Sequence, residues 1–250
     1  MDAQFLKNYK PVKHLLKDKI ILVTGAGSGI GKSVSVAYAK HGATVILMSK
    51  TIKNLEIVYD EIMASGYTEP SIYPLNFKGA TQEDFLKLHD SINKEYGRLD
   101  GLLNNAAQVG GLRPIKLLEP HDWESLTRIN LHSPFLLTQN CIPLLEKSDD
   151  PSILFSIDHK TKAYWGAYGV SKYAQIGLIK ILSKELSGEQ YIRVNGIDPG
   201  PIRTNLRIHN YPGEDPNEIA SPDSVTNSYI YFMGKDSAEI TGQNICLQDT

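Results

Sequence analysis

Short apolar runs alternate with longer segments in which apolar residues recur every three or four positions, from Lys19 to the C-terminus. The short runs are typical of buried strands, and the longer periodicity is typical of helices that bury one face. One strand followed by one helix, repeated along the chain, predicts a parallel sheet with helices on both faces. We therefore expect an α/β fold built on a single doubly wound sheet of about seven strands. The predicted strands are 20–24, 44–48, 71–75, 99–104, 152–157, 192–197 and 244–247.

The predicted helices lie between these strands, and glycine stands just past three of them, where helices commonly end. No break in composition and no repeat divides the chain, so we expect one domain over residues 19–250, preceded by an arm over residues 1–18. Residues 203–222 are rich in Asn, Pro and acidic residues, which predicts a mobile lid at the carboxyl edge of the sheet. The predicted helices are 29–41, 52–65, 82–96, 123–146 and 168–187.

Composition excludes several classes of protein. The chain has 26 basic and 28 acidic residues, so its formal net charge of −2 offers no global attraction to nucleic acid or to an anionic membrane. No apolar run reaches the ~18 residues of a membrane span, and we expect a cytoplasmic protein. Cys141 and Cys246 are too few for a disulfide framework, which fits a reducing compartment. The seven histidines lack the spacing of metal ligands, so no metal site is predicted.

The stretch 23–33, with the sequence VTGAGSGIGKS, follows the first predicted strand and opens the first predicted helix. From Ala26 to Ser33 it can be taken as a relaxed nucleotide-hydrolase P-loop, with Asp158 as the acid for its metal ion, although a strict P-loop begins with glycine. As T-G-x-x-x-G-x-G it is a dinucleotide-binding turn, which we favour. In both cases backbone N–H groups at a helix N-terminus bind phosphate. The expected phosphate-binding residues are Gly25, Gly27, Ser28, Gly29, Ile30 and Gly31.

Tyr168 and Lys172 are four residues apart on a predicted helix, so their side chains share one face. A tyrosine with a pKa of about 10 is a poor proton donor or acceptor at neutral pH. Lowering that pKa to about 7 takes about 4 kcal/mol, which a lysine ammonium about 4 Å away in a partly buried site could supply. The pair therefore predicts an acid–base catalyst, and the alternative is an ordinary solvated pair on a helix surface.

Three further motifs accompany the glycine turn and the tyrosine–lysine pair. Asn104-Asn105-Ala106-Ala107 ends a predicted strand, Asn130 lies in a predicted helix, and residues 199–204 (PGPIRT) follow another strand. In this order the five motifs resemble those of the short-chain dehydrogenase/reductase family, over about residues 18–248. The resemblance implies a Rossmann-type fold and decides against the P-loop interpretation. The stretches 99–106, 165–168 and 213–216 resemble a bacterial subgroup of this family without an established substrate.

The resemblance implies that Tyr168 protonates a carbonyl oxygen while a nicotinamide delivers hydride to the carbon, or the reverse in oxidation. It implies that Lys172 holds the nicotinamide ribose hydroxyls and that Asn130 anchors a water linking the lysine to solvent. An asparagine inside a helix could instead cap a bend in that helix. The further cofactor-binding residues that the resemblance implies are Asn105, Ala106, Ala107, Tyr168, Lys172, Pro199, Gly200, Ile202 and Thr204.

The family also has a serine that hydrogen-bonds the substrate carbonyl. Counting thirteen residues back from the tyrosine gives Phe155, counting 28 residues on from Asn130 gives Asp158, and Ser156 lies between. We prefer the second count, because a loop shortens more easily than a strand shifts by one residue. Three outcomes stay open: Ser156 takes the role, a protonated Asp158 takes it, or the protein is weakly active or inactive toward ordinary ketones. A basic partner on the same loop would keep Asp158 charged and favour the third outcome. The candidates are His159, Lys160 and Lys162.

The end of the second predicted strand indicates the cofactor. Sites that bind NAD usually have an acid there, which accepts hydrogen bonds from a ribose, whereas Ser49, Lys50 and Thr51 stand there in this chain. In the resembling family a small and then a basic residue at this point accompanies the 2′-phosphate of NADP. NADP(H) is therefore preferred, with NAD(H) as the alternative. Asn76, after the third strand, stands where family members often contact the adenine with an aspartate.

The expected function is an NAD(P)-dependent oxidoreductase that transfers a hydride between nicotinamide and a carbonyl or secondary alcohol, a ketoreductase type that includes 3-oxoacyl reductases. The alternative is a non-catalytic or weakly active dinucleotide-binding sensor or scaffold of the same fold. Neither the lid nor the 157–164 loop has a pattern that separates a 3-oxoacyl thioester from a steroid, a sugar or a small ketone. The resemblance also suggests a homodimer or homotetramer, built through the helices at 123–146 and 168–187, which are apolar on more than one face.

Overall fold

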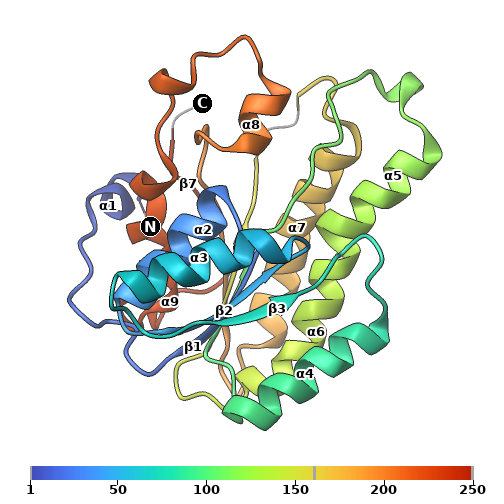
Figure 1. Cartoon of the computed structure of the whole chain (residues 1–250). Helices are drawn as coiled ribbons and strands as arrows, with labels where there is room; N and C mark the ends of the chain where they lie inside the picture. The colour runs from blue at the N-terminus through green and yellow to red at the C-terminus, as the bar shows by residue number, and fades with distance from the viewer. Residues whose placement is uncertain (1, 160–161, 249–250) are drawn as a thin grey trace.

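The computed structural model describes residues 2–159 and 162–248. Its centre is a seven-stranded parallel sheet in the order β3-β2-β1-β4-β5-β6-β7 (Figure 1). The strand order reverses between β1 and β4, which opens a crevice at their carboxyl ends, where ligands bind in sheets of this kind. The predicted doubly wound α/β fold is confirmed. The strands are β1 (Ile20–Thr24), β2 (Thr44–Ser49), β3 (Ser71–Pro74), β4 (Gly101–Asn104), β5 (Ser152–Ser156), β6 (Arg193–Asp198) and β7 (Asn244–Cys246).

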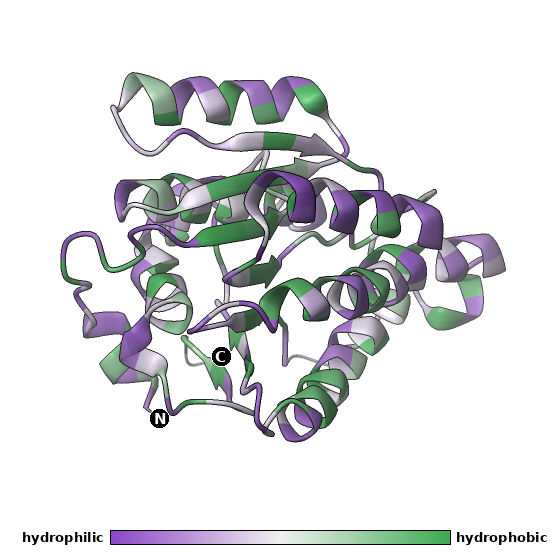
Figure 2. Ribbon diagram, turned by 90° about the horizontal axis from the view of Figure 1, so that it is seen from below, coloured by the Kyte–Doolittle hydropathy of each residue, from purple (hydrophilic) through white to green (hydrophobic). Residues whose placement is uncertain are grey.

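Helices cover both faces of the sheet, so the central strands are buried on both sides and consist of continuous apolar runs. In β1, Ile21 and Val23 pack under α2 (Gly29–Lys40), α3 (Ile52–Ala64) and α9 (Thr226–Met233). The alternate residues Ile20 and Leu22 pack toward the other face. That face is covered by α4 (Gln82–Tyr96), α6 (Ser133–Leu145) and α7 (Gly166–Glu185). Figure 2 shows largely hydrophobic strands enclosed by helices in which hydrophobic and hydrophilic residues are interspersed.

The predicted strand bounds agree with the structure to within two residues, and the helix at Gln82–Tyr96 has the predicted bounds. That helix begins with a capping box between Thr81 and Asp84 and ends at Gly97 in the left-handed conformation. The prediction of one regular helix over 123–146 was wrong. The segment consists of α5 (Pro120–Thr127), a π-helical turn (Arg128–His132) and α6.

Pro134 explains the π-helical turn. In an α-helix the carbonyl of Asn130 would accept the N–H four residues on, and a proline there has no N–H to donate. The helix widens instead, and the N–H of Ser133 reaches back to the carbonyl of Arg128. The widened turn places Asn130 against the loop after β4, which lies beside the crevice.

The arm before β1 packs on its own chain. It begins with α1 (Ala3–Asn8), in which Leu6 is fully buried, and Leu16 further along is also fully buried. The ring of Tyr9 meets Tyr231 of α9 edge to face at 4.9 Å. Burying the two leucines stabilises the arm by about 4 kcal/mol, which fixes it to the domain.

The predicted lid contains α8 (Asn205–Asn210) and a 3-10 turn (Pro216–Glu218), neither of which its polar composition indicated. α8 lies over the carboxyl edge of the sheet (Figure 1). Further 3-10 turns span Ile115–Leu117, Pro222–Val225 and Lys235–Ser237. Across residues 2–159 and 162–248, none of the helices combines the length and the apolar character needed to cross a membrane.

Candidate active site

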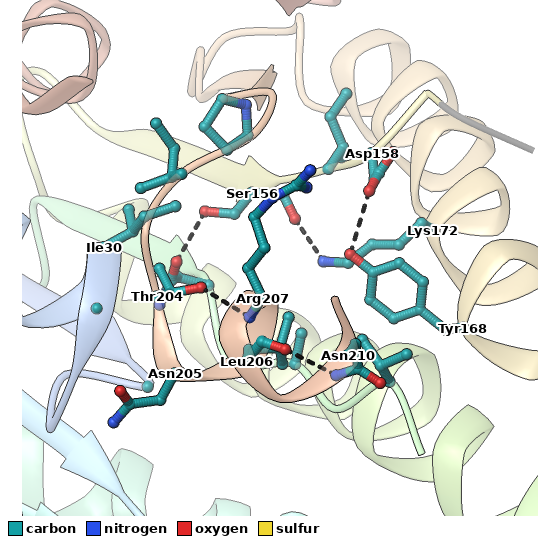
Figure 3. Close-up of a pocket in the computed structure, with 18 of the residues that line it drawn as sticks. Ile30, Ser156, Asp158, Tyr168, Lys172, Thr204, Asn205, Leu206, Arg207 and Asn210 are labelled. Atoms are coloured by element: carbon teal, nitrogen blue, oxygen red, sulfur yellow. Dashed lines mark hydrogen bonds between the residues drawn. The ribbon is translucent and has the colours of Figure 1, made fainter. Parts of the chain in front are cut away.

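Two adjoining cavities lie at the carboxyl edge of the sheet. The first is lined by the glycine turn after β1, the ends of β5 and β6, and residues of α7 and α8 (Figure 3). The second lies over the ends of β2 and β3 and shares part of the glycine turn and of the loop after β4. The residues common to both are Gly25, Ser28, Ala106, Ala107 and Leu206.

The glycine turn brings the backbone close to both cavities. Gly25 has a φ of +69°, and a Cβ on Gly31 would lie 2.2 Å from the carbonyl oxygen of Gly25, so a side chain there would separate α2 from the turn. Ser28, Gly29 and Ile30 at the N-terminus of α2 line the first cavity, and helix N-termini bind anions through their backbone N–H groups. Lys32 forms an ion pair with Glu61 of α3 at 2.7 Å and lines neither cavity, which is not the arrangement of a P-loop lysine.

Thr24 joins the glycine turn to the loop after β4. Its Oγ1 accepts hydrogen bonds from the backbone N–H groups of Asn105 and Ala106 at 2.9 and 3.0 Å. Its carbonyl accepts a third from Nδ2 of Asn105 at 3.0 Å. Two predicted motifs that lie about 80 residues apart in the sequence thus meet at one edge of the sheet.

Tyr168 lies in α7 and is 7% exposed, with its hydroxyl donating to Oδ2 of Asp158 at 3.3 Å. Burial raises the pKa of Tyr168 well above its ordinary value of 10, and the charge of Asp158 and the hydrogen bond to it raise the pKa further. The prediction that Lys172 lowers this pKa toward neutrality was therefore wrong. Tyr168 keeps its proton at neutral pH.

Lys172 is 3% exposed and lies beside the ring of Tyr168, with Nζ 5.9 Å from the ring centre. Its ammonium donates to the carbonyl oxygen of Ser156 at 2.5 Å and to Oε1 of Gln175 at 3.3 Å. Burial lowers the pKa of Lys172 to about 8, although the nearby Asp158 opposes that shift. The lysine is thus held by two neutral oxygens next to the tyrosine. Figure 3 shows the first of these contacts, to Ser156.

The structure separates the three positions considered for the serine. Phe155 is fully buried in the core. The hydroxyl of Ser156 contacts Oδ1 of Asn105 at 3.1 Å and the hydroxyl of Tyr229 at 3.0 Å. Asp158 is the residue of the three that contacts the Tyr168 hydroxyl.

Of the basic residues expected to pair with Asp158, His159 contacts a different acid. The backbone N–H and Nδ1 of His159 both contact Oδ2 of Asp198, at 2.8 and 3.1 Å. Lys162 is exposed, and Lys160 lies outside the described residues. Asp198 is a buried acid that lines the first cavity, and the sequence analysis missed it. Its position between a buried strand and the Pro199-Gly200 motif was the available signal.

His159, Asp198 and Cys246 form a group whose potential ligand atoms lie within 4.8 Å of one another. They come from the ends of β5, β6 and β7, so a search for ligands close together in the sequence could not find them. In the structure Nδ1 of His159 contacts Asp198, and the thiol of Cys246 donates to the carbonyl of Gln248 at 3.0 Å. The contact between His159 and Asp198 therefore joins the ends of β5 and β6, while the thiol of Cys246 bonds within the segment that follows β7.

Asn130 is fully buried in the π-helical turn. Its side chain accepts from the backbone N–H of Gln108 at 2.9 Å and donates to the carbonyl of the same residue at 2.8 Å, so it fixes a neighbouring loop and does not cap its own helix. The backbone carbonyl of Asn130 accepts a hydrogen bond from Nε2 of Gln175 at 2.6 Å. Gln175 was not singled out from the sequence, because a glutamine inside a helix has no distinguishing pattern.

The second cavity contains the three residues predicted to bind the adenosine half of a cofactor, Ser49, Lys50 and Asn76. Oγ of Ser49 accepts the N–H of Thr51 at 3.3 Å, in the place where a carboxylate would stand in an NAD site. Lys78 also lines this cavity and was missed by the sequence analysis. Among the described residues that line the second cavity there are two lysines and no carboxylate.

The predicted Pro199–Thr204 motif connects β6 to the lid. Four of its residues line the first cavity, and Oγ1 of Thr204 caps α8 by accepting the N–H of Arg207 at 3.2 Å. Arg207 forms a bidentate ion pair with Glu214 at 2.6 and 2.7 Å, so its charge is balanced within the lid. The four motif residues are Pro199, Gly200, Ile202 and Thr204.

Comparisons with known proteins find relatives over nearly the whole chain. A model of the short chain dehydrogenase family matches residues 19–215. The chain is 38% identical over 244 residues to the uncharacterized oxidoreductase YciK of Escherichia coli K12, with 96% of each chain covered. A solved Pseudomonas syringae structure, described as a short chain dehydrogenase, is 41% identical with a TM-score of 0.94 and covers 96% of this chain and 99% of its own. A structure from Escherichia coli CFT073, similarly described and complexed with NADPH, is 38% identical with a TM-score of 0.92, covering 96% and 100%.

Proposed function

The chain belongs to the short chain dehydrogenase family, and we propose that it is an NADPH-dependent oxidoreductase that transfers a hydride between nicotinamide and a carbonyl or secondary alcohol. The observation that carries this proposal is the position of the Tyr168 hydroxyl, which lies in the cavity that the glycine turn also lines. A substrate carbonyl in that cavity would meet a proton donor from the chain and a hydride from the cofactor together.

The residues at the carboxyl edge of the sheet fit a dinucleotide phosphate. The close approach of Gly31 to Gly25 leaves the backbone N–H groups of the α2 N-terminus open to an anion. Lys50 and Lys78, with no carboxylate beside them in that cavity, suit the 2′-phosphate of NADPH better than the ribose hydroxyl of NADH. The NADPH complex of the Escherichia coli CFT073 relative supports this choice. The residues proposed to hold the cofactor line one or both cavities, except Gly31, which packs behind them against Gly25. They are Gly25, Gly27, Ser28, Gly29, Ile30, Gly31, Ser49, Lys50, Asn76, Asn105, Ala106, Ala107, Tyr168, Lys172, Pro199, Gly200, Ile202 and Thr204.

When bound, NADPH supplies the hydride that reduces the carbonyl carbon. Tyr168 gives its proton to the carbonyl oxygen, and its raised pKa ensures that it carries that proton at neutral pH. The ammonium of Lys172 lies beside the ring and stabilises the phenolate that remains. Lys172 also orients the nicotinamide ribose, while Asn130 fixes the loop after β4 through Gln108.

Asp158 places a carboxyl group at the hydroxyl of Tyr168. An ionised carboxylate repels a developing alkoxide, whereas a protonated carboxyl can donate a hydrogen bond as serine does. We propose that Asp158 works in its protonated form and returns a proton to Tyr168 after each turnover, since its side chain is partly open to solvent. Ser156 is less suited to this role, because its hydroxyl is already engaged by Asn105 and Tyr229.

The experiment that tests this function uses NADPH carrying deuterium at both hydrogen positions of the nicotinamide C4. Purified protein is incubated with a panel of carbonyls that includes a 3-oxoacyl thioester, a steroid ketone, a keto sugar and a small aryl ketone. We expect NADPH consumption with at least one of them and deuterium on the former carbonyl carbon of the product. Consumption without deuterium in an alcohol product would contradict hydride transfer to a carbonyl.

A non-catalytic dinucleotide-binding protein is the second candidate. The observation in its favour is the carboxylate of Asp158, which raises the pKa of the one tyrosine that would act as acid. This candidate predicts tight NADPH binding with no consumption across the whole panel. It also predicts that Tyr168→Phe changes the stability of the protein and nothing else.

A further inference from the structure

Gln175 connects the lysine of the site to the π-helical turn. It lies one turn after Lys172 on α7 and is 1% exposed. Its Oε1 accepts from Nζ of Lys172 at 3.3 Å, and its Nε2 donates to the carbonyl of Asn130 at 2.6 Å. The orientation of the amide is fixed by chemistry, because an ammonium can only donate and a carbonyl can only accept.

The local sequence makes this carbonyl available. Pro134 stands where an α-helix would need an N–H for the carbonyl of Asn130, so that oxygen is free to accept the side chain of Gln175. A buried carbonyl and a buried ammonium both need partners, and one amide of the right length satisfies both. The bridge therefore joins α7 to the turn between α5 and α6 next to the catalytic pair.

We propose that Gln175 is a positioning residue: its amide holds the ammonium of Lys172 beside Tyr168 and fills the space through which a water would otherwise connect that lysine to the carbonyl of Asn130. This inference rests on the proposed function, because Lys172 matters as the partner of Tyr168. Three hydrogen bonds support the inference: Nζ of Lys172 donates to the carbonyl of Ser156 and to Oε1 of Gln175, and Nε2 of Gln175 donates to the carbonyl of Asn130.

The bridge has a consequence for proton supply. A neutral amide does not pass a proton as a water does, because neither its nitrogen nor its oxygen exchanges a proton readily at neutral pH. Protons that Tyr168 gives to the substrate are then replaced through Asp158, which already contacts the hydroxyl, and not through Lys172. Tyr168 loses one proton to the substrate oxygen, Asp158 returns one, and solvent restores Asp158.

Two substitutions separate positioning from simple packing. Gln175→Met keeps an unbranched side chain of similar length but removes both hydrogen bonds, whereas Gln175→Ala opens a space that can admit a water between Lys172 and Asn130. Ile176→Met, at the neighbouring position of α7, controls for an unrelated change of packing. Thermal unfolding of each variant shows whether it folds.

The first measurement is the pKa of Lys172 by NMR of protein labelled at the lysine Cε carbons, with the signal assigned by its loss in Lys172→Arg. Asp158, Asp198 and Tyr168 also act on this lysine and are unchanged in all the Gln175 variants. Removing one of two acceptors from the ammonium lowers its pKa, so we expect the pKa of Lys172 to be ~1 unit lower in Gln175→Met than in the unsubstituted protein. In Gln175→Ala, where a water can bridge Lys172 and Asn130, the pKa of Lys172 should lie between these two values.

The second measurement is kcat and KM for NADPH with the carbonyl substrate that the panel identifies. Positioning predicts that Gln175→Met lowers kcat by ~10-fold or more with little change in KM, and that Gln175→Ala turns over faster than Gln175→Met. Packing alone predicts the opposite order, because alanine leaves a cavity and methionine does not. Either of two results overturns the proposal: a pKa of Lys172 that is unchanged in Gln175→Met, or a kcat of Gln175→Met that is higher than that of Gln175→Ala. If the unsubstituted protein reduces none of the panel, the proposed function fails while the NMR titration still decides the role of Gln175.

Discussion

The hydroxyl of Tyr168 donates a hydrogen bond to Oδ2 of Asp158 at 3.3 Å, so the proposed proton donor is held by a carboxyl group from the end of β5. Burial alone raises the pKa of Tyr168, and the carboxylate raises it further. The site therefore holds its tyrosine in the protonated form, which suits reduction of a carbonyl. The same contact explains why a charged Asp158 would oppose turnover.

Replacement of Asp158 tests whether its carboxyl group supplies protons to Tyr168. Asp158→Ser supplies a hydroxyl that can donate to the substrate oxygen but removes the carboxyl that returns a proton to Tyr168, so we expect kcat for simple ketones to fall by ~10-fold or more. Asp158→Asn stays neutral but cannot return a proton, and it should turn over more slowly than Asp158→Ser. Steady-state rates of NADPH oxidation between pH 6 and 9 provide the comparison. If Ser156 takes the serine role instead, Ser156→Ala will lose as much activity as Tyr168→Phe.

The buried lysine makes a second prediction, which needs no substrate. The pKa of Lys172 is about 8 in the folded protein and 10.5 as its ordinary value, so between these pH values the unfolded chain binds the proton that the folded chain has released. The contribution of Lys172 to the free energy of unfolding therefore rises with pH over this window, by about 3 kcal/mol. The Lys172→Met variant has no titrating group at this position, so its free energy of unfolding lacks this rise with pH. Urea unfolding of both proteins at pH 8 and at pH 10.5 measures the difference, and a constant difference would contradict the lowered pKa.

The adenosine half of the site predicts the choice of cofactor. Lys50→Ala is expected to weaken NADPH binding by ~10-fold or more with little effect on NADH, because it removes a cation from the 2′-phosphate. Ser49→Asp places an acid at the end of β2 and should favour NADH. Lys53→Ala, on α3 and outside both cavities, is the matched control. Fluorescence titrations at one fixed salt concentration give the dissociation constants, and equal losses for both cofactors would argue against a phosphate contact.

The predicted homodimer or homotetramer depends on the outer faces of α5, α6 and α7. Trp123, Phe135 and Ile181 on these helices are 36%, 40% and 56% exposed. We expect Phe135→Glu to shift the protein toward monomer, because a charge in an apolar contact costs several kcal/mol. Leu86→Glu, on the exposed face of α4, should leave the assembly unchanged. Light scattering after size-exclusion chromatography reports the mass, and a monomer for the unsubstituted protein would show that these helices do not form the contact.

The sheet and the glycine turn could be predicted from the sequence because their signals are local. The residues of β1 are buried on both faces, which requires the apolar run that the sequence displays, and Gly25 and Gly31 mark a turn where the backbone approaches itself. Tyr168 and Lys172 could be paired because four residues on a helix bring side chains to one face. These predictions needed no knowledge of tertiary contacts.

Other features depend on contacts between distant segments. The pKa of Tyr168 is governed by burial and by Asp158, neither of which the i and i+4 spacing contains, so its direction was predicted wrongly. The π-helical turn could be predicted only by noticing that Pro134 has no N–H to donate to the carbonyl of Asn130, within a segment whose pattern is otherwise that of a regular helix. Gln175, Asp198 and Lys78 reach the site through the fold, and their types are common on any helix or loop.

The most direct test of the account is Tyr168→Phe, measured for NADPH affinity and for turnover of the same carbonyl. The substitution removes one oxygen from the first cavity and leaves the glycine turn and both lysines of the second cavity in place. We predict a loss of turnover of ~1,000-fold or more, as expected for removal of a general acid, with the NADPH dissociation constant within about threefold of the original. Turnover by Tyr168→Phe at the original rate would contradict the assignment of this hydroxyl as the proton donor.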